Sequence, residues 1–268
     1  MFFTYKALKQ YDLGKYTWIG FLVFHMMFYS FTLNLMRRFV SLSVLFCSLK
    51  YIREHRWKRY FIVCLILFFI QKTSIVALIL YPIYHLTTGN YEDKLKYKIE
   101  LSHIRFFFKC IIIIGACLGV IFSGELIVYI SNLFGSFTSQ VKYVEENQTI
   151  IWRNLVYMLP LLALMLLFGR DLAKRNDNFS FFILLLSVYI ILWQLQGISR
   201  ETYRISFYFG YSIIVSIPML IKDIKKKENR IGLFGLIFVL MATFYVDYFV
   251  IHLYNETYPY SSTLLGIS

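Results

Sequence analysis

The chain has 268 residues, of which 59% are hydrophobic, 20% aromatic and only 16% charged. A soluble domain is nearer half apolar and a quarter charged, so this composition excludes an ordinary soluble protein. The formal net charge of +13 could suit a nucleic-acid partner, but the placement of the basic residues described below accounts for it without one.

Apolar runs recur along the whole chain and define the candidate membrane spans. In chain order these are residues 16–33, 39–52, 60–70, 75–86, 106–130, 154–168, 179–196, 203–221 and 231–252. Several are shorter than the roughly 20 residues that a straight crossing needs. The pattern predicts an all-α, polytopic integral membrane bundle of about eight or nine transmembrane or half-membrane helices. No long polar stretch divides the chain, so we expect a single domain over residues 1–268.

The runs 60–70 and 75–86 are separated only by the polar sequence QKTS at residues 71–74. Two short helices or a re-entrant hairpin would both fit this pattern. Broken helices at membrane depth are tolerated only where protein or a wet cavity covers the backbone.

The basic residues indicate an orientation. If the spans alternate from a cytoplasmic N-terminus, most of the 28 lysines and arginines fall in inside segments, and the C-terminus lies outside. Cytoplasmic loops of membrane proteins carry this excess of lysine and arginine. The inside loops would contact anionic membrane lipid, which explains the positive net charge.

A smaller set of basic residues falls on the outer side, where topology rules disfavour cations. These residues are Arg37, Arg38, Lys72, Lys142, Arg153, Arg200 and Arg204. For Lys142 an ordinary loop charge touching lipid phosphate is the preferred interpretation. Arg37 and Arg38 open a short span, and Arg200 and Arg204 lie at i, i+4 where another span opens. Arginines at helix N-termini are suited to binding a phosphorylated ligand.

Two long stretches carry a family resemblance. Residues 34–86 begin with NLMRR, continue through a short basic loop, and end in the apolar sequence after QKTS. Residues 203–221 read YRISFYFGYSIIVSIPMLI, and residues 255–260 read NETYPY. These features resemble the EpsG family of Wzy-like bacterial polysaccharide polymerases, which carries an Asn-x-x-Arg-Gln opening and an arginine-led later helix.

The resemblance implies a glycosyltransferase-type polymerase in exopolysaccharide, capsule or O-antigen synthesis. Such an enzyme is a multi-pass protein of the bacterial cytoplasmic membrane that joins repeat units on the outer face. Its partners would be polyprenyl-diphosphate-linked oligosaccharide and other polysaccharide-assembly proteins. Arginines can stabilise a departing diphosphate electrostatically, so neither a metal nor another cofactor is expected.

The expected substrate-binding residues follow from the outer cations and the resembling motifs. They are Asn34, Arg37, Arg38, Gln71, Lys72, Ser74, Arg200, Arg204 and Tyr208. The chain departs from the family at two of them, with Arg38 in place of glutamine and Gln71 in place of histidine. The family also has further helices before the Asn-x-x-Arg motif, so the chain is expected to be truncated at its N-terminus.

Transfer to a sugar hydroxyl calls for a group that accepts its proton. The candidates on or near the outer side are Glu201, Asp247 and His252, with Glu145 and Glu146 behind them. Gln71 is not a candidate, because an amide does not titrate in the physiological range.

Three other functions remain open at this point. A lipid-linked oligosaccharide flippase or transporter would also hold a diphosphate with arginines, but internal repeat symmetry would be expected and none is evident. An O-antigen ligase-like enzyme would share the donor chemistry and use a different acceptor. A non-catalytic membrane component of the same pathway is the third.

Overall fold

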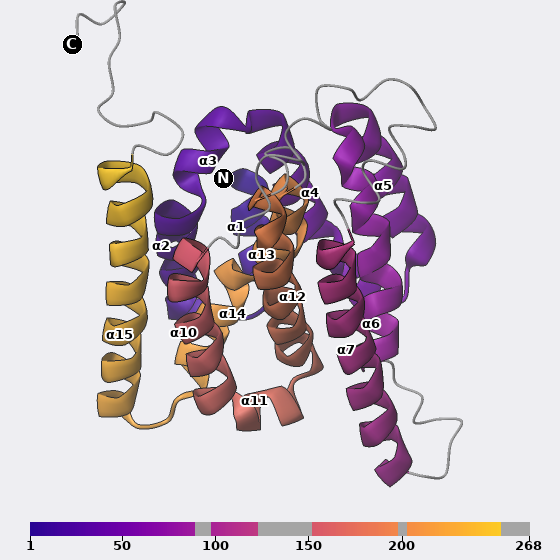
Figure 1. The fold of residues 1–268 in the computed structure, drawn as a ribbon. Helices are drawn as coiled ribbons and strands as arrows, with labels where there is room; N and C mark the ends of the chain where they lie inside the picture. The colour runs from indigo at the N-terminus through magenta and orange to yellow at the C-terminus, as the bar shows by residue number, and fades with distance from the viewer. Residues whose placement is uncertain (89–97, 123–151, 198–202, 253–268) are drawn as a thin grey trace, which may run out of the picture.

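The computed structural model describes residues 1–88, 98–122, 152–197 and 203–252 (Figure 1). Within these ranges the chain is helical and contains no strand, which confirms the all-α prediction. The helices are α1 (Phe2–Lys9), η1 (Gly14–Tyr16), α2 (Thr17–Met27), α3 (Tyr29–Asn34), α4 (Met36–Arg53), α5 (Trp57–Ile70), η2 (Lys72–Ile79), α6 (Leu80–Thr88), α7 (Lys98–Ile121), α10 (Trp152–Phe168), α11 (Arg170–Arg175), α12 (Asp177–Trp193), η3 (Gln194–Gly197), η4 (Tyr203–Ser206), α13 (Phe207–Gly210), α14 (Ile213–Asp223), α15 (Lys227–Tyr245) and η5 (Val246–Ile251).

Successive helices run up and down the bundle, as the alternating spans predicted (Figure 1). The upper end in Figure 1 contains α3, the start of α4, the turn between α5 and η2, and η5, and α10 begins somewhat below them. The lower end contains the turn between α4 and α5, the helix α11, and the start of α15. We use "upper end" and "lower end" in this sense.

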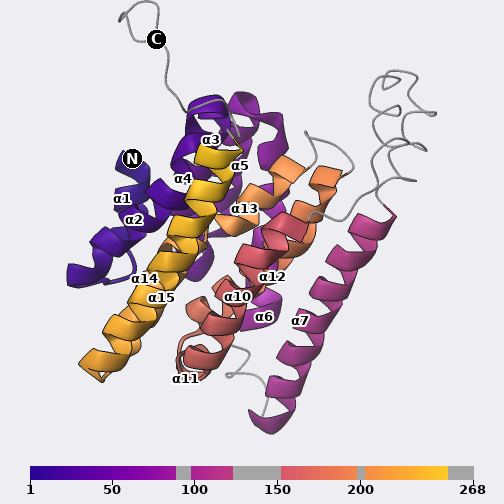
Figure 2. The ribbon, with the colours of Figure 1, turned by 60° about the vertical axis from the view of Figure 1, so that its left-hand side comes forward.

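Among the described residues, three helical segments are long and apolar enough to cross a membrane, and they differ in how far the protein encloses them. In the most apolar stretch of each segment, 89% of the residues are buried for Tyr203–Asp223, 61% for Asp177–Gln196 and only 28% for Lys227–Ile251. The first two therefore form the centre of the bundle and the third lies at its edge: α15 is the left-most helix in Figure 1 and comes to the front in Figure 2. The helix Trp152–Phe168 is apolar but shorter.

The peripheral helices present large apolar side chains outward. Leu65 and Phe69 of α5, Ile114 of α7 and Val239 of α15 are each about half exposed or more. Water would penalise such a surface, whereas the hydrocarbon of a bilayer would not. Together with the apolar helices, this surface makes the protein an integral membrane protein.

The expected break at QKTS is a turn between two helices. Gln71 has an extended backbone, with φ −146° and ψ 109°, and this conformation ends α5 after Ile70. The chain then enters η2, which packs against α5 and continues into α6. Two helical arms joined at Gln71 are thus the arrangement found.

One element was missed at the sequence level. Residues 2–9 form α1, which packs against α4, although they were expected to belong to an inside segment. Thr4 of α1 is completely buried and is hydrogen-bonded to Tyr211 and to Ser43. The Tyr211 hydroxyl also lies 3.0 Å from the Ser43 hydroxyl, so three buried polar groups satisfy one another inside the core.

Candidate functional site

Two arginines stand in the first turn of α4 at the upper end of the bundle. Arg38 is buried, with 5% of its surface exposed, and Arg37 is exposed. This first turn contains no acidic residue. The positive end of the helix dipole disfavours cations at this position, so both the dipole and the guanidinium groups favour an anion here. Arg38 therefore faces protein, whereas Arg37 does not.

A hydrogen-bonded network joins the Gln71 turn to α13. The Tyr208 hydroxyl lies 3.0 Å from the Ser74 hydroxyl and 3.2 Å from that of Thr73. The Gln71 amide donates to Thr73 Oγ1 at 3.1 Å. Ser74 is completely buried and Tyr208 nearly so. Residues from the two resembling stretches therefore meet, although they lie more than 130 positions apart in the chain.

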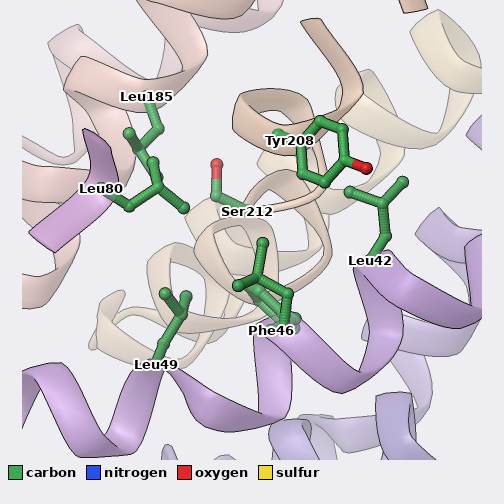
Figure 3. A pocket seen from close by; sticks show the side chains of 8 residues that line it. Leu42, Phe46, Leu49, Leu80, Leu185, Tyr208 and Ser212 are labelled. Carbon is green, nitrogen blue, oxygen red and sulfur yellow. The ribbon is translucent and has the colours of Figure 1, made fainter. Parts of the chain in front are cut away.

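A small cavity lies below Tyr208 (Figure 3). Tyr208 and Ser212 face Leu42, Phe46 and Leu49 of α4 across it, and the remaining wall is apolar. Its enclosed space admits about one water molecule, which is too little for a sugar or a lipid headgroup. This cavity is a packing gap behind the polar network and not a ligand site.

The arginines of α4 and the Tyr208 network belong to the same part of the molecule. The helix η2 packs against both α4 and α13, and α13 follows directly on η4. Lys72 is exposed at the start of η2, and Arg204 lies in η4 one turn before Tyr208. The upper end of these elements is therefore rich in positive charge.

A second polar cluster lies where α15 ends. Asp247, in the π-helical turn η5, forms an ion pair with Arg153 of α10 at 3.6 Å. The ring of His252 is 3.1 Å from the Asp247 carboxylate and 2.9 Å from the Arg153 guanidinium. Tyr157 lies one turn after Arg153 on the same face of α10. Two of the proton-acceptor candidates are thus in direct contact.

The contacts of His252 define which ring nitrogen carries the proton. Nδ1 faces two acceptors, the Asp247 carboxylate at 3.1 Å and the Asp247 carbonyl oxygen at 2.8 Å. Nε2 faces the Arg153 guanidinium, which can only donate. Nδ1 therefore donates and Nε2 accepts, so the lone pair suited to accept a proton is on Nε2.

An aromatic layer separates the two clusters. Phe31 of α3 contacts Phe207, which precedes Tyr208, and Phe249 of η5, with ring centroids 5.0 and 5.3 Å apart. Trp193 contacts Phe207 at 5.4 Å and Tyr248 at 6.5 Å. The rigid rings hold the two clusters at a constant spacing at the same end of the bundle.

The expected site residues that the structure describes can now be placed. Gln71, Ser74 and Tyr208 meet in one network, and Asp247 and His252 meet in the other. Asn34 and Lys72 are exposed at the upper end. Arg200 and Glu201 lie outside the described residues.

Sequence reasoning did not assign Thr73, Arg153 or Tyr157 to a site. Arg153 was noted only as one of the outer cations. Its spacing of four residues from Tyr157 places both on one face of α10, and that spacing is the signal that was available.

Comparison with known proteins adds one finding. The EpsG family model matches residues 1–262. No curated protein and no solved structure matches the chain. The match covers almost all of the sequence, and it agrees with the helical membrane architecture described above. The chain therefore belongs to the EpsG family and is a membrane protein of polysaccharide biosynthesis.

Proposed function

We propose that this protein is a polymerase that joins polyprenyl-diphosphate-linked oligosaccharide repeat units, with the upper end of the bundle at the outer face of the bacterial cytoplasmic membrane. The product would be an exopolysaccharide, a capsule or an O-antigen chain. The observation that carries the proposal is the pair of arginines in the first turn of α4, beside the Gln71–Tyr208 network.

In this proposal the basic residues at the upper end of the bundle bind the donor. The diphosphate of the lipid-linked chain would lie against Arg37, Arg38, Lys72 and Arg204. Guanidinium groups can bind phosphate oxygens through two parallel hydrogen bonds, and they stabilise the charge that develops as the diphosphate departs. Gln71, Ser74 and Tyr208 would position the neighbouring sugar, and Asn34 and Arg200 would complete the site.

The reaction transfers a glycosyl group. A hydroxyl oxygen of the incoming repeat unit attacks the anomeric carbon of the donor sugar. The bond between that carbon and the diphosphate oxygen breaks, and polyprenyl diphosphate leaves with the bonding electrons. The hydroxyl proton passes to the protein base.

Of the two candidates that the structure describes, Asp247 and His252, His252 suits this step better as the base. Its Nδ1–H bonds to Asp247 orient the ring and leave the lone pair on Nε2. The Arg153 guanidinium occupies that lone pair at 2.9 Å, so an acceptor hydroxyl must displace Arg153 before transferring its proton. Asp247 would then stabilise the imidazolium, as the carboxylate of a catalytic triad does.

The direct test uses the purified protein in liposomes with lipid-linked repeat units extracted from a strain that lacks it. Formation of longer lipid-linked chains, read as a ladder on gels, supports the polymerase. Movement of the repeat units across the bilayer without elongation would indicate a flippase. Transfer to a different acceptor would indicate a ligase-like enzyme. Activity that appears only after other assembly proteins are added would indicate a non-catalytic component.

A further inference from the structure

Asn154 is a buried side chain whose polar atoms have no partner. It lies in the first turn of α10, is completely buried, and neither Oδ1 nor Nδ2 forms a hydrogen bond in the described part of the chain. A buried amide in this state lowers the stability of the fold, and a leucine of similar size would remove that cost. Asn154 is therefore a poor choice for packing alone.

The position of Asn154 connects it with the second polar cluster. It follows Arg153 directly, and Arg153 contacts both Asp247 and His252. Asn154 belongs to the face of α10 that continues with Met158, Leu161 and Met165, which are all buried. The Asp247 cluster therefore lies on one side of this turn and the buried amide on the adjacent side.

Trp193 lies at the same height in the bundle. The helices α10 and α12 pack against each other in opposite directions, and Gly169 contacts the Phe179 ring at the lower end. The number of residues from Gly169 back to Asn154 is nearly the same as the number from Phe179 on to Trp193. Each helical residue advances about 1.5 Å along the helix axis, so Asn154 and Trp193 lie at nearly the same height. The Trp193 indole N–H is likewise buried and without a hydrogen-bond partner in the described residues.

Ser206 adds a third group of this kind. Its hydroxyl is buried without a hydrogen-bond partner among the described residues. It is three residues after Tyr203 and one before Phe207, and both of those rings contact Trp193. The upper end of the bundle thus collects an amide, an indole N–H and a hydroxyl, which together offer donors and acceptors to a ligand.

We propose that Asn154 binds hydroxyl groups of the acceptor sugar and holds the sugar against the Asp247–His252 pair. This proposal rests on the proposed function and adds the site for the second substrate. An amide can donate to one sugar hydroxyl and accept from its neighbour. The ring of Tyr157, which is partly exposed one turn after Arg153, suits the apolar face of a sugar ring.

The proposed acceptor site and the donor site differ in their net charge. At the Asp247 cluster the Arg153 cation and the Asp247 anion balance one another, and the orphaned groups beside them are neutral. At the start of α4 and η2 the charges are cationic, with no acid in either first turn. A neutral sugar matches the first site and a diphosphate matches the second.

The acceptor would enter this site past Arg153 and His252, which are more exposed than Asp247 and Asn154. The side chains of Arg153 and His252 are 43% and 40% exposed, whereas the side chain of Asp247 is 19% exposed and Asn154 is completely enclosed. Arg153 covers the Asp247 carboxylate and occupies His252 Nε2. Movement of this one flexible side chain uncovers both groups for the acceptor.

The test compares Asn154→Leu with Met158→Leu, a change one helical turn away on the same buried face. For Asn154→Leu we expect a higher temperature of thermal unfolding in detergent, together with an increase of about tenfold or more in KM for the acceptor repeat unit. The KM for the donor should stay within about twofold of wild type, and Met158→Leu should change neither constant. An unchanged acceptor KM in Asn154→Leu overturns the proposal. A lower unfolding temperature also overturns it, because the amide would then have a structural partner.

A binding measurement separates this proposal from the polymerase itself. The probe is the free oligosaccharide released by mild acid from the lipid-linked repeat units. It should raise the unfolding temperature of the wild-type protein and leave Asn154→Leu unaffected. If the wild-type protein binds this probe and makes no polymer, the acceptor site stands and the polymerase assignment fails. If polymer forms and the probe stabilises both proteins equally, the acceptor site alone is wrong.

Discussion

The hydroxyl groups of Ser74 and Tyr208 lie 3.0 Å apart although 134 positions separate them in the chain. Ser74 is completely buried, so this contact is shielded from water. The network therefore fixes the Gln71 turn against α13, at the same end of the bundle as the arginines of α4. Any ligand at this end of the bundle meets a preorganised surface.

This contact predicts a measurable coupling between the two residues. Tyr208→Phe and Ser74→Ala should each lower the free energy of unfolding, because each leaves a buried hydroxyl with fewer partners. The double variant should be about 1 kcal/mol more stable than the sum of the two single effects implies. Unfolding by SDS titration provides the four free energies. Strictly additive effects would mean that the two hydroxyls do not interact.

Some parts of this fold could be predicted from the sequence and others could not. The apolar runs predicted the helices well, because a membrane-spanning helix must be apolar along its whole length. The helix α1 was missed because it has only eight residues, including Lys6 and Lys9, and it is buried through Thr4 by residues distant in the chain. The hydropathy pattern of a short segment carries no information about contacts with residues distant in the chain.

The candidate site shows the same limit. Arg37 and Arg38 were both recognised as unusual, but which of them is buried depends on the helices packed around α4. Adjacent residues on a helix point about 100° apart, so only one can face a given neighbour. Arg153 was recognised as an outer cation, whereas its pairing with Asp247 depends on the packing of α10 against α15.

Arg37→Lys should shorten the polymer strongly in a strain complemented with the variant. Lysine keeps the charge but lacks the planar pair of donors that binds a phosphate through two hydrogen bonds. The matched control is Arg59→Lys, an exposed arginine in the first turn of α5 at the lower end. It should leave polymer length unchanged. Polymer of wild-type length from Arg37→Lys would show that Arg37 anchors the protein in the membrane and does not bind the donor.

Asp247→Asn and His252→Gln should each reduce the polymerisation rate by about 10²- to 10⁴-fold, the usual contribution of general acid–base catalysis. Asparagine keeps the size of Asp247 but cannot stabilise an imidazolium. The double variant should be no slower than the slower single variant, because residues that act as one unit are not additive. Rates come from purified protein in liposomes. Multiplicative losses in the double variant would assign independent roles to the two residues.

The orientation can be tested with two cysteine variants in intact cells, in a background without the native cysteines. Lys72→Cys lies at the upper end and Lys226→Cys at the lower end, and both positions are exposed. A membrane-impermeant thiol reagent should label Lys72→Cys readily and Lys226→Cys only after the cells are broken. The reverse result would place the diphosphate site on the cytoplasmic side and refute the proposed topology.

Gln71 occupies the position at which the resembled family has histidine, and its contact indicates what the side chain does. Its amide donates to Thr73 Oγ1 at 3.1 Å, which leaves the Thr73 proton available for the Tyr208 hydroxyl 3.2 Å away. A donor is therefore what this position supplies, and basicity is not needed for that role. A histidine can donate in the same way, whereas a glutamate that is ionised can only accept.

We therefore expect Gln71→His to keep most of the polymer yield and Gln71→Glu to abolish it. The glutamate could only accept from Thr73, which would reverse this bond and take the Thr73 proton away from Tyr208, and it would place a negative charge beside the diphosphate. Gln71→Ala should give an intermediate yield, because it removes the donor without adding charge. Polymer yield and length in the complemented strain decide between the roles. If Gln71→His instead raises the yield many-fold, proton transfer takes place at this turn, and the assignment of the base to His252 is wrong.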